Sequence, residues 1–252
     1  MLKVRVIPTL LYKSVGLVKG VGFDAWRRVD TVLPAIKVYN MREVDELILM
    51  DLEATKEGRD PDYESIRDFS RECFVPFCVG GGVGNIGQIK QLLRAGADKV
   101  SVNSAAYENP GLLAQGANMF GSQCIVASID CRKVDHVYYC FSHNGQKNTG
   151  RQLKDWARIV EKAGAGEILL TSVSLDGTMQ GYDIEMIKMV TDVVSIPVIA
   201  SGGAGNYEHM YQAVKEGAAS AVAAASIFHF TEQTPKEAKE YLGERGIPVR
   251  RI

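Results

Sequence analysis

The chain has 252 residues, of which 46% are hydrophobic and 23% charged, and its formal net charge at pH 7 is −1. This length is typical of one eight-fold β/α barrel, although two smaller domains would also fit it. The balanced charge excludes a strongly basic nucleic-acid binder, and a membrane span is excluded because no apolar run approaches the roughly 18 residues that it needs.

Short apolar runs alternate with helical patterns from the first residues onward, and nothing at the start resembles the apolar core of a signal peptide. Eight runs rich in Val, Ile and Leu are predicted as strands: 4–11, 46–51, 75–79, 99–102, 125–130, 168–171, 197–200 and 219–224. Several lack polar alternation, as strands buried on both faces of a parallel sheet do. Helices are predicted at 65–73, 86–95, 153–163, 184–193 and 207–216. The pattern favours a single (β/α)8 TIM barrel.

Two connections are longer than the others. Residues 13–31 follow the first strand, are too long for an ordinary turn into a helix, and are predicted to form a lid over a ligand, with Trp26 as a side chain that could close on it. Residues 132–150 are predicted to form a β-hairpin after the fifth strand, because Asn144-Gly145 suits a type I′ turn.

The five cysteines are odd in number and form no CxxC pair, so we interpret them as reduced thiols of a cytosolic protein. Cys73 and Cys78 have the spacing of half a metal site, but no histidine lies near them in the sequence. We therefore expect neither a metal ion nor a cofactor.

The second half of the chain repeats the first at an offset of 121 residues. Residues 75–82 (VPFCVGGG) align with 196–203 (IPVIASGG), and 45–49 and 96–97 have partners at the same offset. The chain is therefore predicted to consist of two half-barrels, at about 1–122 and 123–252.

Each half carries glycines directly after its third strand, and its fourth strand ends in small or polar residues. Glycine lets backbone N–H groups approach an anion closely, and the helix that follows presents its positive end. Strand ends of a barrel meet at one face, so we predict two facing phosphate sites and a substrate with a phosphate at each end. Alternatively, these glycines only shape tight turns. The residues are Gly81, Gly82, Asn103 and Ser104 in the first half and Gly202, Gly203, Ala225 and Ser226 in the second.

Several segments together resemble the cyclase subunit of imidazole glycerol phosphate synthase, over essentially the whole chain. They are 79–82 (VGGG), 96–103 (GADKVSVN), 120–123 (FGSQ), 164–172, 176–178 (DGT), 181–183 (GYD), 200–205 (ASGGAG) and 228–230 (FHF). The resemblance implies that a glutaminase docks at the bottom of the barrel and that its ammonia travels along the barrel axis. At the top face the ammonia would enter a bis-phosphorylated substrate, which is then cleaved and cyclised.

The resemblance also implies two catalytic aspartates, one ending the first strand and one ending the fifth. Asp130 occupies the second of these positions, but Leu11 occupies the first. Leucine transfers no proton, and loss of one such group is expected to cost about 10²–10⁴ in rate. Either Asp51 or a water replaces the lost group, or the reaction has changed. The other top-face positions that match the family are Lys19, Asp51, Asp176 and Gly177, whereas Ser174 replaces a family acid.

Four charged residues begin strands one, two, four and six and match the family's ring of alternating charges at the ammonia entrance: Arg5, Glu46, Lys99 and Glu167. Two charges of each sign could neutralise one another inside a barrel. Alternatively, they are four separate charges in solvent. Asp98 and Gln123 match the family's glutaminase-docking region.

Three functions remain open. The preferred one keeps ammonia delivery and changes the acceptor, because residues 5–11 (RVIPTLL) resemble bacterial relatives that lack the strand-one aspartate. Those relatives help make acetamidino sugars of surface polysaccharides, with a glutaminase-like partner and a separate sugar amidotransferase. The alternatives are a working cyclase of histidine biosynthesis and a non-catalytic barrel that activates a glutaminase. The related phosphoribosyl isomerase ranks last because it needs a strand-one acid and no charged entrance.

Overall fold

Eight parallel strands close into a barrel in the computed structural model, which describes residues 3–250. Each strand pairs with the next, and closure is completed where β12 pairs with β1, in register from Arg5 with Ala221. The eight predicted strands and the TIM-barrel fold are confirmed. The barrel strands are β1 (Arg5–Lys13), β4 (Leu47–Asp51), β5 (Phe77–Gly80), β6 (Lys99–Val102), β7 (Ile125–Val134), β10 (Glu167–Ser172), β11 (Val198–Ser201) and β12 (Ala221–Ala224).

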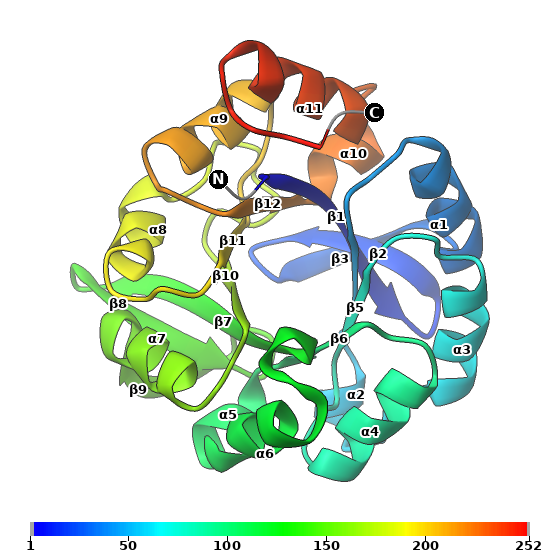
Figure 1. The fold of residues 1–252 in the computed structure, drawn as a ribbon, viewed down its shortest axis with the longest axis vertical. Coiled ribbons are helices and arrows are strands. Elements are labelled where there is room, and N and C mark those ends of the chain that lie inside the picture. Colours follow the sequence, from blue (N-terminus) through cyan, green and yellow to red (C-terminus); the bar gives the residue numbers. More distant parts are fainter. Residues whose placement is uncertain (1–2, 251–252) are drawn as a thin grey trace.

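Helices surround the barrel, as Figure 1 shows. The five predicted helices lie within two residues of their predicted ends. Asn85 and Asn206, related by the 121-residue offset, cap α4 and α9 by accepting from the backbone N–H three residues on. The half-barrel boundaries remain a prediction. The helices are α1 (Val32–Met41), α2 (Ala54–Glu57), α3 (Tyr63–Arg71), α4 (Ile86–Arg94), α5 (Ser104–Glu108), α6 (Gly111–Phe120), η1 (Ser122–Cys124), α7 (Leu153–Lys162), α8 (Ile184–Thr191), α9 (Tyr207–Lys215), α10 (Ser226–Phe230) and α11 (Pro235–Glu244).

The long connection at 13–31 is a regular β-hairpin rather than an irregular loop. Strand β2 (Gly16–Val21) pairs antiparallel with β1 and with β3 (Asp24–Asp30). The turn between them places Gly22 at φ 60° and Phe23 at φ 65°, which matches the sign that a type I′ turn requires. Figure 1 shows this hairpin crossing the barrel opening.

The second long connection forms a three-stranded antiparallel meander. Strand β7 continues to Val134 and pairs with β8 (Val137–Ser142), which pairs with β9 (Lys147–Gln152). A hairpin turn is present at the predicted Asn144-Gly145, with φ 54° and 71°, but it is a longer loop between Ser142 and Lys147 and not the two-residue type I′ turn that the sequence suggested. The earlier turn at Asp135-His136, with φ 47° and 66°, was not predicted from the sequence.

Alternation along the strands divides the barrel interior into layers. At the amino ends lie the four charged residues of the predicted entrance. Above them is an apolar layer of buried side chains, and above that a layer of hydroxyl side chains from five strands. The apolar layer comprises Ile7, Ile48, Cys78, Val126, Leu169, Ile199, Ala221 and Ala223.

The sequence led us to expect neither a membrane span nor a metal site, and the structure bears on both. Within residues 3–250, every helix is too short or too polar to span a membrane. Over the same residues, no three His, Cys, Asp or Glu side chains come together in a way that could hold a metal ion. All five cysteines are free thiols, and Cys78, Cys131 and Cys140 are buried.

A buried ion pair ties the last helix to the barrel. Lys239 of α11 is 3% exposed, and its Nζ donates to the Glu43 carbonyl (2.6 Å) and lies 3.3 Å from Asp45 Oδ1. The other Asp45 oxygen accepts from the Val6 N–H (3.0 Å). Asp45, which lies just before β4, is therefore bonded both to Lys239 of α11 and to the backbone of β1.

Lys239→Ala is expected to lower the free energy of unfolding by about 3–5 kcal/mol, because it leaves the Asp45 carboxylate buried without its cation. Urea unfolding monitored by circular dichroism measures this change. Lys236→Ala, on an exposed position of the same helix, is the matched control. Equal midpoints for the two variants would contradict the stabilising role of the pair.

Candidate active site

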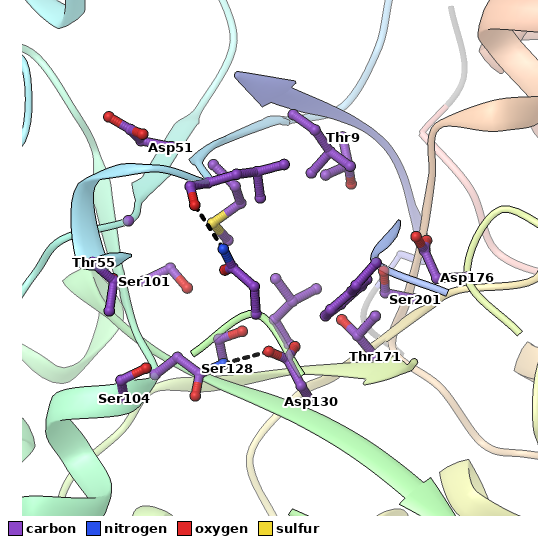
Figure 2. Close-up of a pocket in the computed structure, with 18 of the residues that line it drawn as sticks. Thr9, Asp51, Thr55, Ser101, Ser104, Ser128, Asp130, Thr171, Asp176 and Ser201 are labelled. Atoms are coloured by element: carbon purple, nitrogen blue, oxygen red, sulfur yellow. Dashed lines mark hydrogen bonds between the residues drawn. The ribbon is translucent and has the colours of Figure 1, made fainter. Parts of the chain in front are cut away.

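A cavity of about 340 Å³ opens at the carboxyl ends of the barrel strands. This is the end at which β/α barrels place their active sites, and the volume is that of a small-molecule pocket. Figure 2 shows its labelled polar side chains distributed around the barrel mouth. Every top-face residue predicted from the sequence lines it: Leu11, Lys19, Asp51, Gly81, Gly82, Asn103, Ser104, Asp130, Asp176, Gly177, Gly202, Gly203, Ala225 and Ser226.

Five hydroxyl groups form the floor of the cavity. They come from five different strands, and Figure 2 shows them spaced around the barrel axis: Thr9, Ser101, Ser128, Thr171 and Ser201. The apolar layer lies directly beneath them. The floor is therefore polar toward the cavity and apolar toward the bottom of the barrel.

Asp130 is a buried carboxyl group at the wall of the cavity. Burial raises its pKa to about 7, the hydrogen bond from Asn103 opposes this rise, and the nearby charge of Asp176 adds to it. Asn103 Nδ2 donates to Asp130 Oδ2 at 2.8 Å. A carboxyl group with a pKa near neutrality can both hold and release a proton at working pH.

Leu11 lines the same cavity from β1, beside Met50 of β4 in the sheet register. The strand-one wall is therefore apolar at the position where the resemblance implies an acid. Asp51 is held as the ionic partner of Arg59, which binds both of its oxygens (2.8 and 3.0 Å). Backbone N–H groups of Glu53 and Ala54 also donate to it. Arg59 was not predicted as a site residue, since it lies in a connection without a recognisable motif.

Lys19 and Asp176 connect the hairpin to the cavity wall. Lys19, on β2, is 2% exposed, and its Nζ lies 2.5 Å from Asp176 Oδ2. Burial raises the pKa of Asp176, and Lys19 opposes the rise. The backbone N–H of Gly22 also donates to the Asp176 carbonyl (2.8 Å). The hairpin is thus fastened over the mouth, and Trp26 lines the cavity from β3.

The two predicted anion positions require glycine. Gly81 and Gly203 have φ values of 104° and 107°, and a Cβ at either would lie about 2 Å from a backbone carbonyl oxygen. The halves nevertheless differ, because the Gly82 N–H donates to Thr55 Oγ1 (3.2 Å). Thr55, which was not predicted from the sequence, therefore occupies a backbone N–H of the first position that an anion would otherwise use.

Three polar atoms that line the cavity are buried and have no hydrogen-bond partner among residues 3–250: Thr9 Oγ1, Asn103 Oδ1 and Ser226 Oγ. Buried polar atoms in folded proteins are nearly always paired. Thr9 and Ser226 come from neighbouring strand ends, because β1 pairs with β12, whereas Asn103 follows β6 on the opposite side of the barrel. Unused hydrogen-bonding capacity is therefore present on both sides of the cavity.

The turn between β8 and β9 covers part of the cavity. Asn144 Nδ2 donates to the Leu52 carbonyl (2.6 Å), and the His143 N–H donates to Ser104 Oγ (3.0 Å). A Cβ on Gly145 would lie 3.1 Å from the Phe23 ring, so the two hairpins meet over the mouth. His143 and Asn144 were not predicted as cavity residues, because only the turn itself had a sequence signal.

At the opposite end, the four charged residues close into one ring of ion pairs. Glu46 contacts Arg5 (2.5 Å) and Lys99 (2.8 Å), and Glu167 contacts Arg5 (2.9 Å) and Lys99 (2.9 Å). The alternative of four separate solvated charges is wrong. Burial lowers the pKa of Arg5 and of Lys99, but the two carboxylates more than compensate, and both values are raised.

The predicted docking residues lie at the same end of the barrel. Asp98 is exposed directly before β6, and its Oδ2 accepts from the Phe77 N–H (2.8 Å). Gln123 is exposed in η1, directly before β7. Both therefore lie near the ring of ion pairs on the outer surface of the barrel bottom.

Comparisons with known proteins agree with this geometry. A family model described as "Histidine biosynthesis protein" matches residues 5–234. The chain is 46% identical over 250 residues to imidazole glycerol phosphate synthase subunit HisF of Chlorobaculum tepidum, which covers 99% of this chain and 100% of the relative. The same subunit of Natranaerobius thermophilus is 46% identical, and that of Chlorobium phaeobacteroides 45%, with the same coverage.

Proposed function

Because this chain belongs to the histidine biosynthesis protein family, we propose that it is the ammonia-using barrel subunit of an imidazole glycerol phosphate synthase-type enzyme. Its substrate would carry a phosphate at each end and lie across the top cavity. The main support for the proposal is the position of Asp130. This carboxyl group has a pKa of about 7 and lies between the two predicted anion positions at the glycine pairs. The three unpartnered polar atoms are consistent with a polar ligand in this cavity.

The lower half of the barrel supports an ammonia supply. A ring of ion pairs stands at the bottom, the apolar layer follows, and the hydroxyl floor of the cavity lies above it. A small neutral molecule is the species that such an apolar layer admits most easily, because a charge there would be unpaired.

A protein partner at the bottom fits the exposed apolar side chains there. Met41 ends α1, Phe74 lies between α3 and β5, and Met119 lies in the last turn of α6, all at the amino ends of the strands. They are 75%, 79% and 60% exposed. Large apolar side chains exposed at one end of the barrel are suited to contact with another protein. We propose a glutaminase as this partner, near Asp98 and Gln123.

The comparisons favour this synthase function over the surface-polysaccharide role that the sequence favoured, because the relatives named above are all imidazole glycerol phosphate synthase subunits. One observation keeps the other role as a second candidate. Leu11 leaves the strand-one wall without an acid, and a barrel that only passes ammonia to a separate sugar amidotransferase needs no acid there.

Turnover of the synthase substrate tests the proposal. With ammonium chloride as the nitrogen source, we expect product at a rate about 10²–10⁴ below that of the Chlorobaculum tepidum subunit, because one proton-transfer group is replaced by Leu11. A parallel reaction supplies glutamine and the glutaminase encoded in the same genome, and product there shows coupling.

The outcomes separate the candidates. Slow turnover in both reactions supports the synthase. Absence of product from a protein that still binds the glutaminase favours the second candidate. A rate equal to that of the relative would contradict the effect assigned to Leu11, and failure to bind the glutaminase would remove the ammonia supply from the proposal.

A further inference from the structure

The titratable side chains of the cavity differ in whether they have an ionic partner. Lys19 is paired with Asp176, and Asp51 with Arg59. Among the described cavity residues, the titratable groups without a salt bridge are Asp130 and His143 and, at an exposed position on the rim, Glu108. A site that must both give and take protons needs two such groups.

His143 is held in a costly backbone conformation. It has φ 53°, and Asn144 and Gly145 after it are also left-handed, at 54° and 71°. Left-handed backbone is disfavoured for residues other than glycine, and such residues gather at functional sites. Neither the resemblance nor the turn chemistry requires histidine at the first of these three positions, since Asn144-Gly145 already makes the turn.

A hydrogen bond at Nδ1 fixes the orientation of the His143 ring. Its Nδ1 is hydrogen-bonded to Oγ of buried Ser142 (3.0 Å), and its backbone N–H donates to Ser104 Oγ (3.0 Å). The other ring nitrogen, Nε2, has no hydrogen-bond partner within residues 3–250 and is not among their buried unpaired atoms. Because the residue lines the cavity, Nε2 is the nitrogen available to a ligand.

We propose that His143 contacts the substrate through Nε2, next to the first anion position, and is the second proton-transfer group of this cavity. The inference rests on the proposed synthase function and deepens it. Neutral His143 accepts a proton from the substrate at Nε2 while protonated Asp130 donates one to it. The cavity keeps its proton count, and exchange with water restores both groups. Histidine suits this exchange because it is the side chain that titrates most readily near neutral pH.

Several charges lie around the turn and would influence that exchange. Arg132 approaches from β7, with its Nη2 3.4 Å from the Cβ position of Gly145. The Asp51–Arg59 pair lies beyond Leu52, to which Asn144 is bonded. The Lys19–Asp176 pair also lines the cavity, and Asp130 lies on the neighbouring strand β7, in register with Phe141, two residues before His143. The two pairs are internally neutralised, so Arg132 and Asp130 are the charges that bear on His143 most directly.

His143→Asn tests the proposal, with His136→Asn as the matched control. Both histidines are left-handed residues of hairpin turns in the same meander, and asparagine tolerates that conformation, but His136 is exposed away from the cavity. We expect His143→Asn to lower kcat by about 10²-fold and to change the pH profile of kcat/KM. His136→Asn should behave as wild type. A His143→Asn variant with the wild-type rate and profile would overturn the proposal.

A binding measurement keeps the test independent of turnover. The ring resonances of the four histidines are followed by NMR while inorganic phosphate is added. Phosphate should move the His143 resonance and raise its titration midpoint, because an anion bound beside the ring favours the protonated form. The His136 resonance should not move. If phosphate binds and His143 does not respond, the contact is refuted even if the synthase reaction proceeds. If His143 responds but no substrate turns over, the synthase function fails and the contact stands.

Discussion

Replacing Leu11 by Asp is expected to raise the ammonia-dependent turnover of the synthase substrate by about 10²-fold, the lower end of what a positioned proton-transfer group contributes. Leu11 lines the cavity from β1, and its side chain gives that wall no group that can hold a proton. A carboxyl group there would share the cavity with Asp130 and raise the number of proton-transfer groups. Steady-state kinetics with ammonium chloride measures the change.

Leu11→Asn is the control for this variant. It has the shape and polarity of the aspartate without a titratable proton, so it should not raise the rate. The fold increase in rate from Leu11→Asp should be larger in a His143→Asn background, because the new carboxyl group is then the only proton-transfer group beside Asp130. Equal rates for Leu11→Asp and the wild type would mean that Leu11 is not what limits the reaction.

Asp130→Asn should have the opposite effect on turnover, a loss of about 10²–10⁴-fold, and should at the same time stabilise the fold above pH 7. Burial raises the pKa of Asp130 to about 7, so the folded state keeps a proton between about pH 4 and 7 that the unfolded state has released. Stability must therefore fall as the pH rises through this window. Asparagine carries no charge to bury and can still accept a hydrogen bond from Asn103.

Thermal unfolding from pH 5 to pH 8.5 measures the second effect. The variant should gain free energy of unfolding on the order of a few kcal/mol at pH 8, and this gain should shrink as the pH falls toward 5. Glu108→Gln, at an exposed position on the rim of the same cavity, controls for the loss of a carboxyl charge and should show neither effect. A pH-independent change in Asp130→Asn would contradict the raised pKa.

The top-face residues predicted from local patterns were found at the cavity, because strand ends and glycine turns are local features. The residues that were missed have no such signal. Thr55 and Arg59 belong to the connection after β4 and reach the cavity only because Gly82 and Asp51 lie beside them in the folded barrel. His143 reaches it because β8 and β9 extend the barrel sheet past β7 and bring their turn back to Ser104.

The amino-acid sequence by itself determined the strand count, the barrel and the positions of the glycine pairs. These follow from apolar runs, helix caps and backbone freedom, which act over a few residues. Only the tertiary structure decided how charges pair. Arg5 and Glu167 are 162 residues apart and meet because the barrel closes, and closure likewise turned four separate charges into one ring. It also decided that Asp51 is held by Arg59 while Asp130 and His143 remain unpaired, because ionic partners depend on which strand ends become neighbours.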